Sequence, residues 1–382
     1  MSADAARCSP LDRAHMARAL ALAERGLFTT QPNPRVGCVI AHGELVVGEG
    51  WHARAGEAHA EIHALHAAGD RARGATAYVT LEPCAHHGRT PPCADALVAA
   101  GIARVVVAAQ DPFPQVAGRG IEKLRRAGIV VDDGLLHEPA REINLGFFSR
   151  IERGRPFVRL KLAMSLDGRT ALASGESQWI TGEAARADVQ RWRARGSAIL
   201  TGSGTVLADD PQLTVRLGDD TPFVPPLRVV LDRTLRIPRS RRVFDDAAPT
   251  LLLHGVDATP CEEWRATLAS VAVAEHDGRL SLPAVLALLA AREVNELHVE
   301  AGATLGGALL AQGLVDELLL YVAPVLLGDD ARPLLCLPPL LSMAQRHRLR
   351  LLDQQRFGED LRLRLRPATA PHQARPSSPA QA

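Results

Sequence analysis

Apolar and polar positions in the first part of the chain repeat with two different periods. Apolar residues recur at helical spacing over residues 11–25, 59–68, 93–100 and 119–127, which predicts helices there. Short apolar runs at 36–40, 45–47, 77–81, 104–109 and 129–131 predict strands. A short turn separates the first two runs, so we expect them to form a hairpin. Strands that alternate with helices predict a layered α/β domain with a mainly parallel sheet.

The pattern breaks near residues 151–156, where charged residues, Gly and Pro cluster. Such a cluster is typical of a domain boundary, and we place one there. A second α/β series follows it. Its strands are expected at 157–163, 198–200, 228–231, 250–253, 297–299 and 318–322, and its helices near 182–194, 281–292 and 304–312. The sequence thus predicts two α/β domains, at residues 1–150 and 151–366.

The C-terminal end of the chain has a different composition. Residues 367–382 contain four prolines and almost no large apolar side chains. Burial cannot offset the entropy of ordering such a segment, so we predict a disordered tail. In the preceding residues, 361–366, Leu and Arg alternate, which favours an antiparallel strand with a solvated arginine face over a basic binding edge.

Charge and cysteine content narrow the function classes. The chain has 44 basic and 43 acidic side chains, and this balance gives no general attraction to nucleic acids. No apolar run approaches the roughly 18 residues of a membrane helix, and charges near the N-terminus argue against a signal peptide. Six cysteines are too few for a disulfide framework in a chain of 382 residues. We therefore expect a soluble, cytoplasmic protein that binds neither nucleic acid nor membranes.

Three residues of the first domain form a candidate zinc site. His59 opens a predicted helix, Cys84 follows a predicted strand, and Cys93 opens the next helix. A catalytic zinc keeps three protein ligands, whereas a structural zinc has four, so this count favours a catalytic site. Glu61 is then the candidate general acid/base that moves protons to and from the substrate. Two alternatives stay open: His63 could add a fourth ligand and close a structural site, or the histidines could hold no metal.

The order of these residues resembles that of zinc-dependent nucleobase deaminases, whose signature is H-x-E followed by P-C-x-x-C. Here eight residues separate the cysteines. The full string EPCAHHGRTPPC at residues 82–93 is similar to one family in particular, the bifunctional riboflavin-biosynthesis deaminase/reductases. The strings PNPRVG at 32–37 and DPFPQVAGRG at 111–120 extend the resemblance. The resemblance implies a cytidine-deaminase-like three-layer domain. In the loop between the cysteines, His86 and Arg89 could contact substrate or lie on the surface.

The second domain lacks the sign of a standard dinucleotide fold. No G-x-G-x-x-G string follows the strand expected at 157–163. The string EAGATLGG at 300–307 could bring backbone close to a phosphate, but alone it also fits an ordinary strand-to-helix turn. The strings KLAMSLDGRT at 161–170, SQWIT at 177–181 and GSGTVLADDPQLTVR at 202–216 resemble the reductase half of the same family. The resemblance implies a dihydrofolate-reductase-like fold that uses NADPH.

The resemblance implies cofactor and substrate contacts for the residues of this sequence that match the family's motifs. The expected cofactor contacts are Ala163, Trp179, Thr205, Asp209, Gly302, Ala303, Thr304, Leu305, Gly306, Gly307 and Ala308. The expected substrate contacts are Ser177, Arg193, Leu213, Arg216 and Glu300. Two alternatives stay open here also: Arg193 could lie on a solvated helix face, and Trp179 could be a core residue. Ser165, Arg169 and Ser203 lie close to these motifs and favour NADPH over NADH.

The resemblance implies two successive reactions on pyrimidine nucleotides. The first domain would hydrolyse the 2-amino group of 2,5-diamino-6-(5-phosphoribosylamino)pyrimidin-4-one. The second would reduce the ribose of 5-amino-6-(5-phosphoribosylamino)uracil to the ribityl form, with Lys161 and Asp209 as candidates to assist proton transfer. We also expect a homo-oligomer, a dimer. The rival hypotheses are a cytidine or tRNA deaminase fused to a binding domain, and a structural zinc protein.

Overall fold

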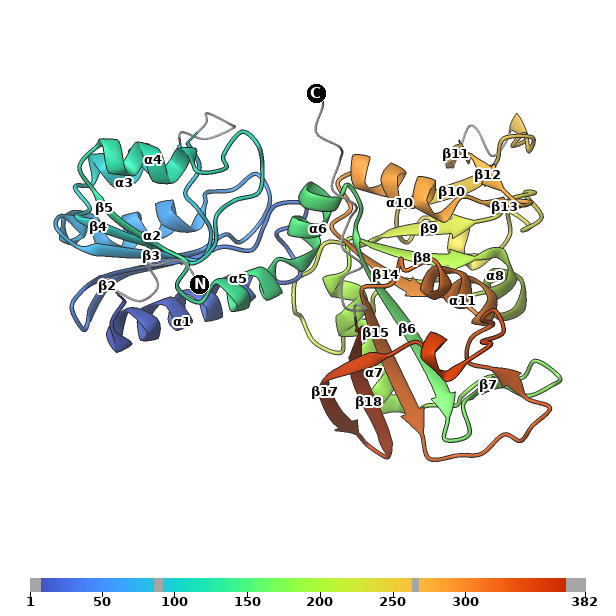
Figure 1. Ribbon diagram of the computed structural model, residues 1–382. Coiled ribbons are helices and arrows are strands. Elements are labelled where there is room, and N and C mark those ends of the chain that lie inside the picture. Colours follow the sequence, from blue (N-terminus) through green and yellow to red (C-terminus); the bar gives the residue numbers. More distant parts are fainter. Residues whose placement is uncertain (1–7, 86–91, 263–267, 369–382) are drawn as a thin grey trace, which may run out of the picture.

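A computed structural model of the chain describes residues 8–85, 92–262 and 268–368, which form two α/β units side by side (Figure 1). The first unit is built on a five-stranded sheet of order β2-β1-β3-β4-β5. Its strands are β1 (Gly37–His42), β2 (Leu45–Trp51), β3 (Thr76–Val79), β4 (Arg104–Val107) and β5 (Val130–Asp133). The hairpin makes β1 antiparallel to β2, and β1 is also antiparallel to β3, so β1 runs against the direction that the other four strands share. The sheet is therefore mixed: four of its five strands share one direction, as a mainly parallel sheet requires, but two of its four neighbouring pairs are antiparallel.

Helices cover both faces of this sheet. One face packs against α2 (Ala60–Ala68), α3 (Cys93–Ala99) and α4 (Arg119–Arg126). The other packs against α1 (Pro10–Glu24), α5 (His137–Ile143) and α6 (Leu145–Arg153). Alternate residues of β1 explain this division, because Cys38 and Ile40 belong to the first core and Val39 and Ala41 to the second. This arrangement confirms the predicted three-layer domain.

The second unit contains a nine-stranded sheet of order β11-β10-β9-β8-β14-β6-β15-β18-β17. Its strands are β6 (Phe157–Ser165), β8 (Ala198–Gly202), β9 (Leu227–Leu231), β10 (Thr250–Gly255), β11 (Ala269–Val273), β14 (Glu296–Glu300), β15 (Glu317–Ala323), β17 (Leu349–Phe357) and β18 (Asp360–Pro367). All neighbouring pairs from β11 to β15 are parallel, while β18 is antiparallel to both β15 and β17. The helices are α7 (Glu183–Arg195), α8 (Ser203–Asp209), α10 (Leu282–Ala291) and α11 (Ala303–Ala311).

Short elements complete the second unit. The two-stranded pairs are β7 (Arg169–Ala171) with β16 (Arg332–Pro333), and β12 (Glu275–His276) with β13 (Arg279–Leu280). Its main core is formed by apolar residues of the central strands together with those of α10 and α11. Within the described residues, no helix is long and apolar enough to span a membrane.

The predicted ends of the second domain, residues 151 and 366, lie inside helix α6 and strand β18. Helix α6 crosses residue 150, and the chain passes to the second sheet between Arg153 and Phe157. Pro367, which we placed at the start of the tail, is the last residue of β18, and residues 369–382 lie outside the described part of the chain.

The arginines of β18 are not the solvated face that alternation predicted. Strand β18 lies inside the sheet, and Arg362 forms ion pairs with Asp188 and Asp353. Arg364 and Arg366 both pair with the buried Glu317 of β15. The prediction failed because the acidic partners come from other elements of the fold.

Candidate active sites

His59, Cys84 and Cys93 come together as the sequence predicts. His59 is the residue before α2, Cys84 lies in the loop after β3, and Cys93 is the first residue of α3. The His59 Nδ1 atom is 3.3 Å from Cys93 Sγ and 3.7 Å from Cys84 Sγ. All three ligand atoms lie within 4.8 Å of one another. One imidazole and two sulfurs at these separations fit a zinc ion.

Local backbone contacts bring the three residues together. A side chain at Gly50 of β2 would place its Cβ 2.4 Å from the Ala60 carbonyl oxygen, so only glycine lets α2 approach the strand this closely. The Ala94 amide donates to the Cys84 carbonyl, and the Cys93 amide donates to Cys84 Sγ at 3.2 Å. These two bonds join the loop after β3 to the start of α3. These backbone contacts therefore position Cys84 and Cys93 beside each other.

The electrostatics of the cluster favour a thiolate at Cys84. Hydrogen bonds from the Cys93 thiol and from His59 hold the pKa of Cys84 well below its usual range. His63 does not join the group of potential ligands among the described residues. The described cluster therefore has the three ligands of an open site, and it gives no support to His63 as a fourth. His86 and Arg89 lie outside the described residues.

Glu61 lies in the first turn of α2, two residues after His59. Its side chain is 3% exposed, and burial raises its pKa to about 7. A carboxyl group with a pKa near neutrality can both accept and donate a proton, which suits a general acid/base.

In the second unit, two strand-to-helix turns lie side by side. Gly202 ends β8 and precedes α8, and Gly302 follows β14 and precedes α11. Strands β8 and β14 are parallel neighbours, and a Cβ at Gly202 would lie 3.4 Å from the Leu305 side chain. Ligands of parallel α/β sheets bind at the carboxyl ends of the strands, which is where both turns lie.

The glycines of the second turn have different surroundings. A Cβ at Gly302 would meet no atom within 4 Å, so its surface is open. A Cβ at Gly306 would lie 3.1 Å from Leu335, and one at Gly307 only 2.1 Å from the Cys336 carbonyl oxygen. Gly302 could therefore approach a ligand, whereas Gly306 and Gly307 allow the segment after β16 to pack on α11.

The other expected cofactor contacts are spread over several elements. Ala163 is on β6, while Thr205 and Asp209 are on α8. Trp179 is 69% exposed, which excludes a core position, and the Arg186 guanidinium lies 4.7 Å from its ring centre. The expected contacts Ala303, Thr304, Leu305 and Ala308 all belong to α11.

The expected substrate residues include a buried ion pair. Arg193 of α7 donates through Nε and Nη2 to both carboxylate oxygens of Glu300, at the end of β14. Arg193 also donates to the Thr214 carbonyl oxygen at 2.9 Å. It is buried, so it does not lie on a solvated helix face.

The remaining substrate candidates lie near this pair or near Trp179. Leu213 is buried next to Thr214, and the Arg216 amide donates to Gln190 of α7. Ser177 lies in the loop before α7. Lys161 of β6 is close enough to Glu300 and Arg193 to interact with their charges, although burial lowers its pKa.

Sequence reasoning missed two residues beside these sites, His52 and Arg236. His52 is 2% exposed; its Nδ1 lies 3.1 Å from the Ala58 carbonyl, and its Nε2 lies 3.0 Å from the Asn33 amide nitrogen. Because a carbonyl can only accept, Nδ1 of His52 carries the proton. Its Nε2 then accepts from the Asn33 amide, so the ring is neutral. Arg236 donates through Nε and Nη2 to Ser203 Oγ. Neither contact has a sequence signal, because the partners are far apart in the chain.

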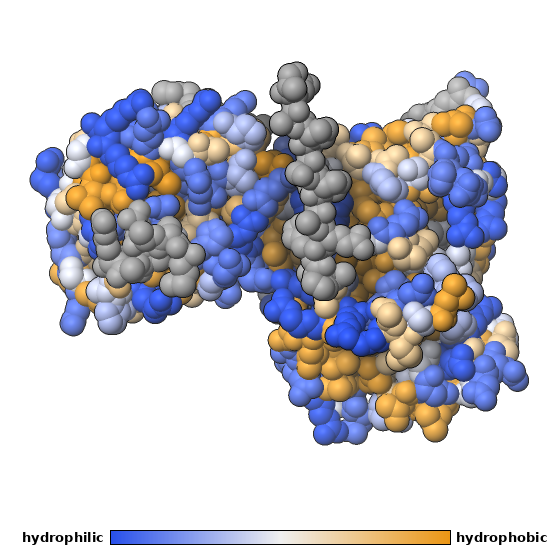
Figure 2. All heavy atoms as spheres, in the orientation of Figure 1, coloured by the Kyte–Doolittle hydropathy of each residue, from blue (hydrophilic) through white to orange (hydrophobic). Residues whose placement is uncertain are grey.

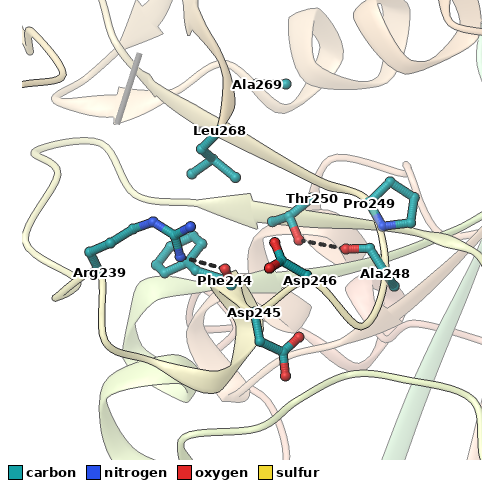
Figure 3. Close-up of a pocket in the computed structure, with 9 residues that line it drawn as sticks. All are labelled: Arg239, Phe244, Asp245, Asp246, Ala248, Pro249, Thr250, Leu268 and Ala269. Carbon is teal, nitrogen blue, oxygen red and sulfur yellow. Dashed lines mark hydrogen bonds between the residues drawn. The ribbon is translucent and has the colours of Figure 1, made fainter. Parts of the chain in front are cut away.

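A separate cavity of about 240 Å³ lies at the start of β10 and β11 (Figure 3). Its polar rim is internally bonded, with Arg239 donating to the Phe244 carbonyl and Thr250 to the Ala248 carbonyl. None of the predicted site residues lines it. It also lies at the amino ends of these strands, opposite to the end at which Gly202 terminates β8.

Two family models match the chain, one for each unit. Residues 9–109 match the cytidine and deoxycytidylate deaminase zinc-binding region, and residues 156–363 match the RibD C-terminal domain. The riboflavin biosynthesis protein RibD of Escherichia coli is 51% identical over 364 residues, covering 93% of this chain and 99% of its own. The RibD of Haemophilus influenzae is 47% identical and covers 94% and 98%.

Solved structures give the same result. A structure of Acinetobacter baumannii RibD is 45% identical with a TM-score of 0.87, covering 94% of this chain and 99% of its own. The diaminohydroxyphosphoribosylaminopyrimidine deaminase/5-amino-6-(5-phosphoribosylamino)uracil reductase of Thermotoga maritima is 32% identical with a TM-score of 0.81 and the same coverage. With its zinc-type His/Cys/Cys group and its reductase unit in one polypeptide, the chain belongs to the RibD family of bifunctional riboflavin-biosynthesis deaminase/reductases.

Proposed function

We propose that this chain catalyses two successive steps of riboflavin biosynthesis. The first is hydrolytic deamination of 2,5-diamino-6-(5-phosphoribosylamino)pyrimidin-4-one. The second is NADPH-dependent reduction of 5-amino-6-(5-phosphoribosylamino)uracil to its ribityl form. The observation that carries the proposal is the three-ligand group with the buried Glu61 beside it, in the same chain as a reductase unit.

In the deaminase unit, His59, Cys84 and Cys93 would hold the metal. When bound, Zn²⁺ supplies a Lewis acid that lowers the pKa of water. Glu61 would take a proton from water and return it to the departing ammonia, which its pKa of about 7 permits near neutral pH. Cys84 and Cys93 would stay deprotonated as ligands, so Glu61 is the group left to carry protons.

In the reductase unit, bound NADPH supplies a hydride to the sugar. The open turn at Gly302 and the α11 amides behind it, together with Thr205 and Asp209 of α8, would contact the cofactor. Arg193, Glu300 and Arg216 would contact the nucleotide substrate, with guanidinium groups facing its phosphate or hydroxyls. Lys161 and Asp209 remain our candidates for the proton that accompanies hydride transfer.

Preference for NADPH over NADH requires a partner for the ribose 2′-phosphate. Ser203 begins α8, and the Arg236 guanidinium is bonded to its hydroxyl, so a charge and a hydroxyl stand together beside the cofactor motif. Ser165 is occupied differently, because it is buried and bonded to Asp167 and Arg169. We therefore assign the 2′-phosphate contact to Ser203 and Arg236.

The free cysteines of the chain support a location in the cytoplasm. All six cysteines are free of disulfides, and two of them are the proposed metal ligands. Reducing compartments keep such thiols unpaired. We accordingly retain the cytoplasm as the proposed location and small pyrimidine nucleotides as the binding partners.

A homodimer through the β17 end of the second sheet is our proposal for the oligomer. Strand β17 ends the strand order, and Leu349, Leu351 and Leu361 are exposed there. Figure 2 shows hydrophobic side chains gathered over the part of the second unit where β17 and β18 lie. A second copy would cover them. Sedimentation equilibrium should give a dimer for the wild type and a monomer for Leu351→Glu, and a monomeric wild type would contradict this proposal.

One incubation tests the two activities. The zinc-loaded chain is mixed with the diamino nucleotide, with and without NADPH, and products are identified by mass together with released ammonia. We expect the uracil product and ammonia without NADPH, and the ribityl product only when NADPH is added. Ammonia release from cytidine instead of the diamino nucleotide would favour the rival deaminase hypothesis. Failure of a zinc-loaded chain to release ammonia from either would exclude both.

A further inference from the structure

One buried carboxylate beside the metal group accepts four backbone hydrogen bonds. Glu82 Oε1 accepts from the amides of Gly120 at 2.9 Å and Ile121 at 3.1 Å. Its Oε2 accepts from the amides of Gly118 at 3.0 Å and Asp111 at 3.3 Å. The side chain belongs to a residue that is only 4% exposed. Glu82 thus collects donors from one segment, residues 110–121, which follows β4.

These bonds replace a cap that α4 lacks. The residue before the helix is Gly118, with a φ of 77°, and glycine has no side chain to cap the first turn. The first amides of any helix have no partner within the helix. Glu82 satisfies those of Gly120 and Ile121 from another loop, and its negative charge suits the positive end of the helix. The start of α4 therefore depends on Glu82.

The same segment is packed against the metal-binding loop. A Cβ at Gly120 would lie 1.9 Å from the Pro83 carbonyl oxygen, so the two backbones are in direct contact next to Cys84. The Glu82 amide in turn donates to the Ala109 carbonyl at 2.9 Å. Strands β3 and β4 are parallel, so the loops that follow them lie at one edge of the sheet. That edge is where such sheets bind ligands.

We propose that Glu82 is a positioning residue of the deaminase, which holds residues 110–121 against the Cys84 loop and so fixes one wall of the pyrimidine site. This inference rests on the proposed deaminase function. In this proposal Glu82 contacts neither the metal nor the substrate. It acts through its hydrogen bonds to the backbone of residues 110–121. The segment contains Asp111, whose buried carboxyl group is close enough to Cys84 to interact with the charge of its thiolate.

Glu82→Gln tests the geometry directly. The amide has the same shape as the carboxylate, but its nitrogen cannot accept, so one of the two pairs of backbone bonds must be lost. In the zinc-loaded full chain, hydrogen exchange of residues 110–121 should become about tenfold to a hundredfold faster, as expected for losing bonds to a charged group. Glu122→Gln is the control, because Glu122 is an exposed carboxylate of α4 paired only with Arg126 in the described contacts. It should leave exchange unchanged.

Kinetics test the consequence for the substrate. In Glu82→Gln we expect the deaminase KM to rise about tenfold or more, with kcat changed much less and with full zinc content. Glu82→Asp keeps both acceptor oxygens on a shorter side chain and should recover part of the loss. The reductase activity of the same molecules, which should stay at the wild-type level, reports that the chain is folded.

Three results would overturn the proposal. One is wild-type exchange in residues 110–121 of Glu82→Gln, and another is a wild-type KM despite faster exchange. The third is loss of zinc from Glu82→Gln, which would make Glu82 a support of the metal site as a whole. If the wild type releases no ammonia from the diamino nucleotide, the proposed function fails separately, while the exchange experiment still decides whether Glu82 holds the segment.

Discussion

Glu61 and its neighbours show how burial at a single residue defines a chemical role. Its carboxyl is withdrawn from water, and this raises its pKa into the range in which one group can accept and then donate a proton. The three metal-ligand candidates lie within reach of it because His59 directly precedes α2, on which Glu61 lies. The acid/base role that we propose thus depends on one side chain whose charge state burial controls.

We predict that Glu61→Gln keeps its zinc but loses deamination by roughly a hundredfold or more, the usual cost of removing a general acid/base. The amide has the shape of the carboxyl but cannot carry the proton. Ammonia release measures the loss, and NADPH oxidation by the same sample should be unaffected. Ammonia release near the wild-type rate would remove Glu61 from the reaction.

A second residue-scale prediction concerns the cofactor. Arg236→Gln should raise the KM for NADPH by about tenfold or more and leave the KM for NADH unchanged, because the lost group is a charged donor to the 2′-phosphate. Arg233→Gln is the matched control, since Arg233 lies three residues earlier and pairs with Glu275 instead of Ser203. Equal effects of Arg236→Gln on both cofactors would contradict the assignment.

Residue types alone made some of these positions predictable. His59, Cys84 and Cys93 could be recognised because they belong to motif strings and lie at element boundaries, and the structure brings them together. The pairing of Arg193 with Glu300 could not be predicted, because 107 residues separate them in the chain. The contacts of Glu82 were hidden for a further reason, since its partners are backbone amides that no side-chain pattern reveals.

At the scale of elements, periodicity located the strands that lie inside each sheet. The predicted runs at 157–163, 250–253 and 318–322 correspond to β6, β10 and β15. Helices α5 and α6 were missed, because helices of seven and nine residues show too few turns for a clear helical period. Strand β17 was also missed, because most of its residues are exposed and it therefore shows no buried face.

The turn before α11 gives a prediction at this scale, because its glycines serve two different purposes. Gly302→Val should raise the KM for NADPH about tenfold or more, since the side chain would enter open space on the side where we propose the cofactor, and it should lower stability only by the small cost of a poorer N-cap residue for α11. Gly307→Ala should instead destabilise the second unit by about 1–3 kcal/mol, because its Cβ would collide with the Cys336 carbonyl. Thermal unfolding and cofactor titration of the two variants separate these effects.

A reversal of the two outcomes would contradict this assignment. If Gly302→Val unfolded the second unit while keeping its cofactor affinity, the turn would be a structural element only. If Gly307→Ala lost cofactor affinity at full stability, the contact between α11 and the Cys336 segment would belong to the cofactor site.

At the scale of the whole molecule, buried charges join the two units. Arg35, which precedes β1, donates to Oε1 of Glu296. The Oε2 atom of Glu296 accepts from Arg159 and Arg195. Arg35 and Glu296 are both almost fully buried. Nothing in the sequence indicated this pair, because a lone Arg in a loop and a Glu at the start of a strand usually face solvent. The relative placement of the two units was accordingly beyond prediction from the sequence.

We predict that Arg35→Met lowers the free energy of unfolding at neutral pH by about 3 kcal/mol, because breaking a buried pair leaves a carboxylate oxygen without its partner. The variant also loses the bond from Arg35 to the Ile143 carbonyl. Urea unfolding of the full chain measures the change. Arg126→Gln removes an ion pair that is exposed on both sides and should cost less than about 0.5 kcal/mol.

The effect of pH distinguishes a charge effect from a packing effect. Burial by itself would raise the pKa of Glu296, but the charges of Arg195, Arg35 and Arg159 outweigh burial and hold that pKa well below its usual 4.5. A carboxylate whose pKa is lower in the folded chain stabilises it above the unfolded pKa, and this contribution is lost as the pH falls through the folded pKa. The stability difference between wild type and Arg35→Met should therefore be constant between about pH 6 and pH 8 and should shrink in acid below about pH 4.5. A difference that persists unchanged in acid would mean that Arg35 joins the two units by packing and not by charge.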